Sequence, residues 1–364
     1  MSYDPDFRRD TPLARKIKDR IRAQGGTHLA DYIGECLWDE EYGYYATRSV
    51  IGQDGDFITA PEISQVFGEL IGLWSAVVWQ QMGSPEAVNL VEFGPGRGTL
   101  MADALRATRS VAGLHAAMKV SLMEASASMI AAQRSKLAGA AVPVAWIDGY
   151  KALHEPSIII ANEFVDALTP DQCVKTDDGW RWRGVKLDDA GRLQFGISEG
   201  TRIRHDLHTR WPDAPVGSIC EYHRHEYIAE GIQTMGRPVA ALIIDYGHTE
   251  TVLCDTLQAV RNHAYEHPLC SPGEADLTAQ VDFADLASAM TKSGLVVDGP
   301  TTQAEFLGRL GIVERASKLM GANPGKAGEI EAGVMRLMAP NGMGTRFKVI
   351  GVRSPNVAKL PGFE

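Results

Sequence analysis

Three glycines at alternate positions follow an apolar segment that carries an acidic residue near its end. The apolar segment runs from Asn89 to Phe93, and Gly94, Gly96 and Gly98 come directly after it. A helix-like stretch from Leu100 to Arg106 completes the pattern of a strand, a tight loop and a helix N-terminus. Because glycine has no Cβ, such a loop lets the backbone approach a polar ligand closely. The loop therefore predicts a ligand site at the end of a buried strand.

Strand-like and helix-like segments alternate around and after this loop. Strands are expected at residues 88–93, 118–123, 142–147, 157–161 and 239–244, and helices at 99–108 and 126–138. Such alternation is typical of a parallel sheet with helices on both faces, whose ligands bind beyond the carboxyl ends of the strands. Polar residues stand at or near four of these ends: Glu92, Glu124, Asp148 and the pair Asn162-Glu163.

The regular alternation is interrupted between residues 171 and 237. This stretch contains a hairpin pattern around Trp180 and a helical pattern over residues 219–233. The N-terminal part favours helices at 11–23, 27–37 and 61–81, with Thr27 as a cap. We expect an N-terminal helical cap with an active-site loop at 1–85, an α/β core at 86–170 and 238–364, and an inserted α+β region for substrate or partner binding at 171–237.

The glycine spacing discriminates among adenosine-containing ligands. A dinucleotide fingerprint needs Gly-x-Gly-x-x-Gly and an acid ~20 residues further on. Here the spacing is Gly-x-Gly-x-Gly, Glu124 is more distant, and no lysine follows as in a P-loop. S-adenosylmethionine fits better, because Glu124 can accept hydrogen bonds from its ribose diol and Asp148 from its adenine amino group. Glu92 suits the ammonium group of the same cofactor.

These residues also have ordinary structural explanations. Glu124 could be a solvated helix cap, and Asp148-Gly149 is as typical of a turn as of an adenine contact. The segment 263–267 matches the His-x-x-Glu-His form of zinc hydrolases, but Pro268 would end the helix that this form needs. No further metal ligand is signalled, so we expect no metal site.

Charge and composition narrow the class of partner. The formal net charge is −10, which disfavours non-specific binding to nucleic acid or to anionic lipid, because both need a cationic surface. No apolar run of ~18 residues that could span a membrane occurs, and the N-terminus lacks the apolar core of a secretory signal. The five cysteines are scattered and odd in number, which fits a reducing compartment. Together these features predict a bacterial cytoplasmic protein.

Several longer motifs carry a resemblance to a known family. The segment 92–100 resembles the hallmark of the MidA family, which includes the mitochondrial complex I assembly-factor arginine methyltransferase. The segments 55–64, 161–168, 244–247 and 272–278 resemble that family too. The resemblance spans nearly the whole chain and implies a Rossmann-like class I methyltransferase sheet that uses S-adenosylmethionine. In the mitochondrial members, the methyl acceptor is an arginine of the 49-kDa-type subunit of complex I.

An arginine acceptor sets a chemical requirement that the strand-end acids can meet. A guanidinium is protonated in water, so carboxylates must hold it through paired hydrogen bonds. Glu163 is the best-placed candidate and Asp166 the second, while Asn162 could hold the cofactor or the acceptor nitrogen. The loop from Asp56 to Ser64 is expected to fold over the cofactor, with Thr59 or Glu62 touching it.

The glycine loop does not identify the methyl acceptor. The same loop would occur in a protein that only binds the cofactor and in an enzyme that transfers its methyl group. One alternative is a non-catalytic assembly chaperone that binds S-adenosylmethionine as a structural ligand. Another is a methyltransferase that acts on a different acceptor, such as a small molecule.

Overall fold

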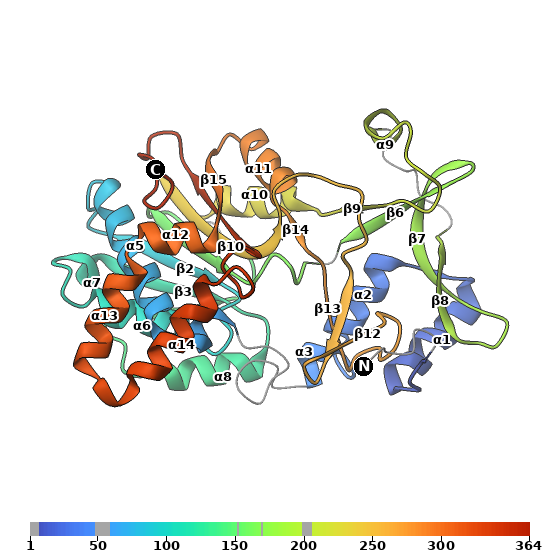
Figure 1. Cartoon of the computed structure of the whole chain (residues 1–364), viewed down its shortest axis with the longest axis horizontal. Helices are drawn as coiled ribbons and strands as arrows, with labels where there is room; N and C mark the ends of the chain where they lie inside the picture. Colours follow the sequence, from blue (N-terminus) through green and yellow to red (C-terminus); the bar gives the residue numbers. More distant parts are fainter. Residues whose placement is uncertain (1–6, 48–58, 151–152, 169, 199–205) are drawn as a thin grey trace.

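The chain folds into two lobes, which Figure 1 shows side by side. The computed structural model describes residues 7–47, 59–150, 153–168, 170–198 and 206–364. The larger lobe is built on an eight-stranded sheet. The smaller lobe contains the N-terminal helices together with a five-stranded and a three-stranded sheet.

The eight-stranded sheet has the order β15-β16-β10-β5-β2-β3-β4, and β14 adds to β10. Its strands are β2 (Val88–Phe93), β3 (Met118–Met123), β4 (Val144–Ile147), β5 (Ser157–Asn162), β10 (Val239–His248), β14 (Val281–Asp282), β15 (Val296–Thr302) and β16 (Phe347–Arg353). All neighbours from β4 to β10 pair in parallel, whereas β16 is antiparallel to both β10 and β15. This arrangement confirms the α/β class and the parallel core predicted from the alternating segments.

The carboxyl end of β2 lies where the strand order reverses. From β2 the chain proceeds to β3 and β4 on one side, and it then returns to β5 on the other side of β2. Connections that leave neighbouring strands in opposite directions open a crevice between the carboxyl ends of those strands. The glycine loop follows β2 directly, so it lies at this crevice.

Helices cover both faces of the large sheet. One face carries α5 (Gln65–Gln81), α6 (Thr99–Thr108), α12 (Gln303–Arg309), α13 (Ile312–Ala322) and α14 (Ala327–Met338), and the other carries α10 (His225–Thr234) and α11 (Phe283–Lys292). Successive strand residues point to opposite faces, so Leu90 packs in the first layer and Val91 in the second. The remaining elements of this lobe are α4 (Ala60–Ile63), α7 (Leu114–Ala117), α8 (Ala127–Lys136) and the 3₁₀ turn η1 (Pro324–Lys326). In the described ranges, none of the helices has both the length and the apolar character needed to cross a membrane.

The smaller lobe combines segments from three parts of the sequence. Its helices are α1 (Pro12–Gln24), α2 (Leu29–Trp38), α3 (Tyr44–Thr47) and α9 (Asp206–Arg210), and its strands are β1 (Thr27–His28), β6 (Asp171–Thr176), β7 (Gly179–Leu187), β8 (Leu193–Ile197), β9 (Ile219–Tyr222), β11 (Gln258–Arg261), β12 (Ala264–Glu266) and β13 (Asp276–Thr278). One apolar cluster joins Leu13 and Tyr32 to Val185 and Leu277. Residues of the expected cap and insertion therefore share a core, while the borders at 85, 170 and 237 stay a prediction.

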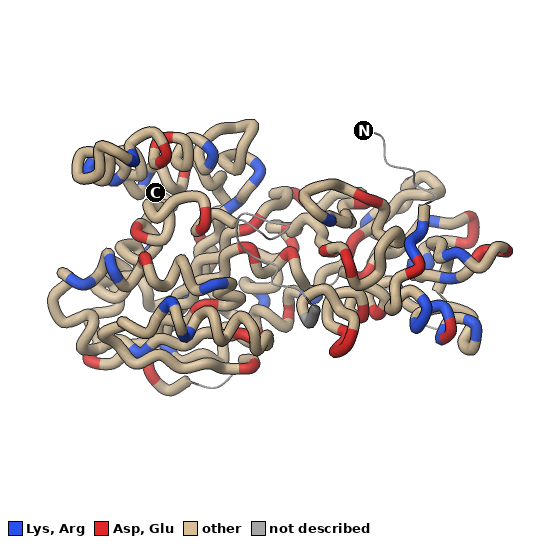
Figure 2. Tube along the Cα trace, turned by 90° about the horizontal axis from the view of Figure 1, so that it is seen from below, with Lys and Arg blue, Asp and Glu red and all other residues tan. Residues whose placement is uncertain are grey.

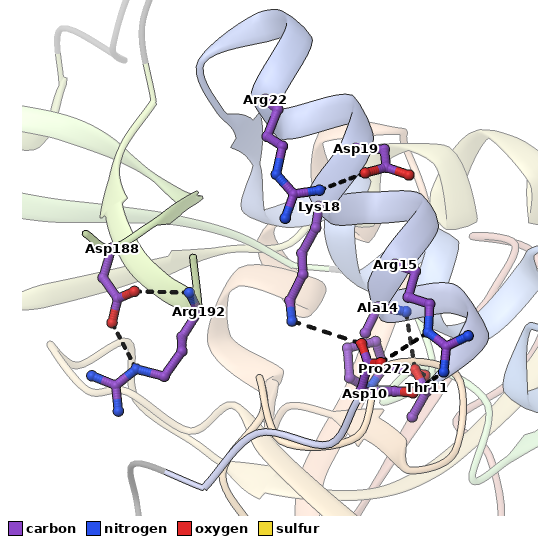
Figure 3. Close-up of polar contacts among 10 residues, drawn as sticks. All are labelled: Asp10, Thr11, Ala14, Arg15, Lys18, Asp19, Arg22, Asp188, Arg192 and Pro272. Carbon is purple, nitrogen blue, oxygen red and sulfur yellow. Dashed lines mark hydrogen bonds and ion pairs between the residues drawn. The ribbon is translucent and has the colours of Figure 1, made fainter. Parts of the chain in front are cut away.

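Polar contacts fix the first helix to this lobe (Figure 3). The Oγ1 of Thr11 accepts a hydrogen bond from Ala14 N at 3.0 Å and thereby caps α1. The same hydroxyl donates to the carbonyl oxygen of Pro272 at 2.7 Å, so the cap also ties α1 to a distant segment. Nearby, Asp188 Oδ1 accepts from Arg192 N at 2.8 Å and closes the β7–β8 turn, which the hairpin pattern predicted.

Three local predictions were wrong, each because a long-range pairing determines the local structure. Thr27 does not cap a helix, because β1 pairs with β7 before α2 begins. Residues 219–222 form β9, which pairs with β6, and only 225–234 are helical. No strand was predicted between residues 249 and 279, but this segment contains the β12-β11-β13 sheet.

Close packing of α5 on α6 leads to a stability prediction. A Cβ on Gly72 would lie 2.5 Å from the Cα and 2.7 Å from the carbonyl oxygen of Ala104. Backbone cannot move cheaply, so we expect Gly72→Ala to lower the free energy of unfolding by about 2 kcal/mol, although alanine is the better helix former. Urea unfolding measures this change.

Gly34 provides the matched control, because a Cβ there meets no heavy atom within 4 Å. Gly34→Ala in α2 should therefore raise the free energy of unfolding by up to about 1 kcal/mol. Stabilisation of similar size by both substitutions would contradict the close contact between α5 and α6.

Candidate active site

A cavity of about 350 Å³ opens at the carboxyl ends of β2, β3 and β5. Its lining comprises Trp38, Tyr45, Gly94, Gly96, Met123, Glu124, Ala125, Ser126, Met129, Asp148, Gly149, Tyr150, Glu163, Phe164, Ala167 and Leu168. Five residues proposed from the sequence therefore face one cavity, namely Gly94, Gly96, Glu124, Asp148 and Glu163. The other six, Thr59, Glu62, Glu92, Gly98, Asn162 and Asp166, are not among its lining residues, and the roles of all eleven stay predictions.

The glycine loop has a backbone that other residues adopt with difficulty. Gly94, Gly96 and Gly98 have φ angles of +59°, +53° and +79°, all in the left-handed region. A Cβ on Gly94 would also lie 3.0 Å from the ring of Phe164. Gly98 then occupies the N-cap position of α6. The loop thus leaves its backbone open to the cavity and begins a helix beside it.

Glu124 is held in place by the start of α8 and by a side chain that the sequence did not single out. Its Oε1 accepts hydrogen bonds from Ala125 N at 2.9 Å and Ser126 N at 2.8 Å. Its Oε2 accepts from Gln133 Nε2 at 3.1 Å. Burial raises the pKa of Glu124. The carboxyl group therefore caps backbone amides and lines the cavity at the same time.

Gln133 of α8 connects three parts of the site and is fully buried. Besides Glu124, its Nε2 donates to the carbonyl oxygen of Gly96 at 2.7 Å. Its Oε1 accepts from the indole nitrogen of Trp146, on β4, at 2.7 Å. A glutamine within the helix predicted at 126–138 was the available signal, but its partners are visible only once β3 and β4 pair.

Glu92 lies beneath the glycine loop as a buried acid. The residue is 3% exposed, and its Oε2 finds no hydrogen-bond partner among the described residues. Burial raises the pKa of Glu92 to about 8. An uncompensated buried carboxyl fits a site that binds a cation, because a neighbouring positive charge would favour its ionised form.

A second group of acids follows β5. Glu163 has a φ of +51°, and its Oε1 accepts from Ala60 N at 2.8 Å and from Asn162 Nδ2 at 3.1 Å. Burial, with a further contribution from the charge of Asp166, raises the pKa of Glu163 to about 7. Burial raises the pKa of Asp166 to about 6, although a hydrogen bond from Tyr246 opposes that shift. Two carboxyls that change charge near neutral pH therefore lie next to each other.

Asp245 positions this second group. It belongs to segment 244–247, which carries part of the family resemblance, but no role was predicted for it. The residue is fully buried within β10, three residues before its end. Its Oδ2 accepts from Val165 N at 2.9 Å and Asp166 N at 3.1 Å. Burial and the charge of Asp166 raise the pKa of Asp245 well above its usual range. This side chain therefore holds the backbone that presents Glu163 and Asp166.

The predicted covering loop is described only from Thr59 onward, and residues 55–58 of its motif lie outside the described ranges. Thr59 is the N-cap residue of α4, and Ala60 N donates to Glu163. Glu62 accepts a hydrogen bond from the hydroxyl of Thr99 at the start of α6. Neither Thr59 nor Glu62 is among the lining residues, so in this structure they connect α4 to the site rather than line it.

The His-x-x-Glu-His segment is not a helix. It spans the turn between β11 and β12 together with β12 itself. In the ranges that the structure describes, no group of three or more His, Cys, Asp or Glu residues is arranged to hold a metal ion.

Replacing Gln133 should destabilise the fold. Gln133→Leu would leave the indole of Trp146, the carbonyl of Gly96 and Glu124 without their buried partner. We expect the free energy of unfolding to fall by about 2–4 kcal/mol in urea unfolding. Gln80→Leu, at an exposed position of α5, is the control and should change it by less than about 0.5 kcal/mol. Equal effects of the two substitutions would show that the Gln133 hydrogen bonds contribute nothing.

The raised pKa of Glu92 predicts a pH dependence. The folded state retains a proton that the unfolded state loses near pH 4.5, so the wild type loses stability as pH rises from about 4.5 to 8. Glu92→Gln has no carboxyl group to titrate here, so its stability does not fall in this way. Its free energy of unfolding, relative to that of the wild type, should therefore increase by up to about 1.4 kcal/mol per pH unit between pH 5 and 8. Denaturant unfolding across this pH range measures the difference.

Glu305→Gln serves as the control, because the fold shifts the pKa of Glu305 in the opposite direction to that of Glu92. Hydrogen bonds from Thr301 and Thr302 lower the pKa of Glu305 to about 2. The contribution of Glu305 to the free energy of unfolding is therefore constant above pH 5. A difference between wild type and Glu92→Gln that is flat from pH 5 to 8 would contradict the buried, protonated state of Glu92.

Comparison with known proteins agrees with this geometry. The model of a family of S-adenosyl-L-methionine-dependent methyltransferases matches residues 70–301. The chain is 34% identical to human mitochondrial protein arginine methyltransferase NDUFAF7, over 93% of this chain and 82% of that protein. It is 32% identical to the zebrafish (Danio rerio) protein, over 96% and 88% of the two chains.

A solved structure extends the likeness to the whole fold. A methyltransferase superfamily member from Burkholderia thailandensis, bound to S-adenosyl-homocysteine, superposes with a TM-score of 0.85 at 26% identity and covers 98% of this chain and 97% of its own. The match of the sequence and of the fold leads to one conclusion: the chain belongs to the S-adenosylmethionine-dependent methyltransferase family that includes NDUFAF7.

Proposed function

We propose that this methyltransferase modifies the guanidinium group of an arginine in a protein substrate. The observation that carries the proposal is the pair of half-buried acids with raised pKa values, Glu163 and Asp166, beside the cavity that the glycine loop lines. The human and zebrafish relatives are named protein arginine methyltransferases, which supports the same acceptor.

The residues at the other end of the cavity fit the cofactor. When bound, S-adenosylmethionine supplies a methyl group that its sulfonium has already activated. In the proposal, Glu124 accepts hydrogen bonds from the ribose hydroxyls and Asp148 from the adenine amino group. Glu92, buried and without a partner for Oε2 among the described residues, provides the counter-charge for the cofactor's ammonium.

The acceptor end is organised to receive a cation. Among the described residues, the hydrogen bonds to Glu163 engage Oε1, which leaves Oε2 for the substrate. A guanidinium is always charged and offers several donors in one plane, which suits two neighbouring carboxylates. Because the methyl transfer itself needs little chemistry from the protein, the main task of Glu163 and Asp166 is to align the attacking nitrogen.

This arrangement predicts how the rate depends on pH. Glu163 and Asp166 hold protons below about pH 7 and 6, and in that form they cannot pair with a guanidinium. The kcat/KM for an arginine peptide should therefore rise as pH increases from 5.5 to 8. Glu163→Gln should remove the part of this rise that occurs near pH 7, and it should lower kcat/KM by about 10² or more. Transfer of a labelled methyl group from S-adenosylmethionine measures both effects.

Glu230→Gln, at an exposed position of α10, is the matched control and should keep wild-type rates. Full activity of Glu163→Gln at pH 8, with the same pH profile as the wild type, would contradict the proposed role of Glu163.

We further propose that the natural substrate is a subunit of the 49-kDa type in respiratory complex I, and that the protein acts in the bacterial cytoplasm. The family resemblance supports the substrate, and the scattered, odd-numbered cysteines support the reducing compartment. Incubation of the purified protein with labelled S-adenosylmethionine and a lysate of a strain lacking it should label one band of that size. Tight cofactor binding without any labelling would instead favour a non-catalytic assembly chaperone, and a labelled small molecule would favour a different acceptor.

A further inference from the structure

Aromatic side chains from the smaller lobe form part of the cavity wall, and one of them, Tyr45, lies close enough to Asp166 for that charge to raise its pKa. Trp38 is the last residue of α2, and Tyr45 belongs to α3. Their rings stack with centroids 4.6 Å apart and an interplanar angle of 25°. Both residues line the cavity, and Leu168 of the larger lobe lines it too. The cavity therefore has walls from both lobes.

Hydrogen bonding fixes the inner ring of this pair. The hydroxyl of Tyr45 donates to Asp276 Oδ1, on β13, at 3.2 Å, and Asp276 is buried. Burial raises the pKa of Tyr45, and the charges of Asp276 and Asp166 raise it further. The ring thus stays a neutral donor with carboxylates beside it. Figure 2 shows that acidic residues are frequent near the junction of the lobes.

Trp38 is the exposed member of the pair. Half of its surface, 50%, is accessible, although tryptophan gains more than any other residue from burial. Its ring rests on Tyr45 on one side and borders the cavity that also contains Glu163. An accessible indole next to unneutralised carboxyls matches the chemistry of a cation site, because the face of an aromatic ring attracts a cation and the acids supply its hydrogen-bond acceptors.

We propose that Trp38 and Tyr45 form the aromatic wall of the acceptor site and that the face of the Trp38 ring receives the cationic side chain of the substrate protein. This inference rests on the proposed function, and it adds a residue of the smaller lobe to substrate selection. The guanidinium lies between the aromatic wall and the carboxyls of Glu163 and Asp166. The substrate segment consequently binds at the junction of the two lobes, and Trp38 is a specificity residue rather than a cofactor contact.

Calorimetry on three variants tests this wall. The probes are S-adenosylhomocysteine, an arginine-containing peptide from the 49-kDa-type subunit, and the same peptide with citrulline in place of arginine, both peptides measured with S-adenosylhomocysteine present. Trp38→Ala and Trp38→Leu should weaken binding of the arginine peptide by about 10-fold, and Trp38→Phe should restore most of the affinity. All three should bind S-adenosylhomocysteine within about twofold of the wild type, and the neutral citrulline peptide should bind weakly to wild type and variants alike.

Steady-state methyl transfer provides the second readout. Trp38→Ala should raise the KM for the peptide by about 10-fold and change kcat by less than about threefold. Tyr227→Ala is the matched control, because this tyrosine is 61% exposed on α10 and does not line the cavity. It should leave every one of these quantities unchanged.

The outcomes separate the inference from the proposed function. Wild-type peptide affinity in Trp38→Ala overturns the aromatic wall, as does a failure of the wild type to bind the peptide at all. A parallel loss of S-adenosylhomocysteine affinity also overturns it, because Trp38 would then contact the cofactor. Peptide binding that depends on Trp38 without any methyl transfer supports the wall and contradicts the proposed catalytic function.

Discussion

The amide of Gln133 is the contact on which the glycine-loop end of the cavity depends. It joins the glycine loop after β2, the acid after β3 and an indole on β4 through hydrogen bonds of 2.7–3.1 Å. Each partner is polar and buried or partly buried, so the loss of this one amide would leave several groups unsatisfied at once. Asp245 has the equivalent role beside Glu163, where it fixes the turn that presents Asp166. Two buried side chains on the elements around the crevice thus determine the shape of both halves of the cavity.

Burial of carboxyl groups connects this architecture to function. Glu92 and Glu163 have pKa values raised to about 8 and 7 because the fold removes them from water and provides them with few or no positive charges. Such groups destabilise a folded protein in their ionised form, unless a cation enters the site. A cofactor with an ammonium and an acceptor with a guanidinium would supply one cation at each end. Functional sites are where such unfavourable groups are retained, because their cost is recovered when the ligands bind.

The sequence predicted the parts of this site that depend on local pattern. The strands that end near Glu92, Glu124 and Glu163 were found from apolar runs, and the left-handed loop from its glycines. Gln133 and Trp38 were not, since their importance comes from residues that are brought together only when distant strands and lobes pack. The same reason explains the short strand β9, which resembled the start of a helix until its pairing with β6 was known. Helices α12 to α14 were not predicted either, although they cover one face of the large sheet.

The central claim is that the glycine loop and Glu124 form the S-adenosylmethionine site. Calorimetric titration of S-adenosylhomocysteine into the wild type, Gly96→Val and Glu124→Ala tests it most directly, with circular dichroism to verify that each variant is folded. The φ of +53° at Gly96 excludes a β-branched side chain without strain, so Gly96→Val should weaken binding by about 100-fold or more. Glu124→Ala should weaken it by about 10-fold, the equivalent of one charge-assisted hydrogen bond. Unchanged affinity in both folded variants would contradict the account.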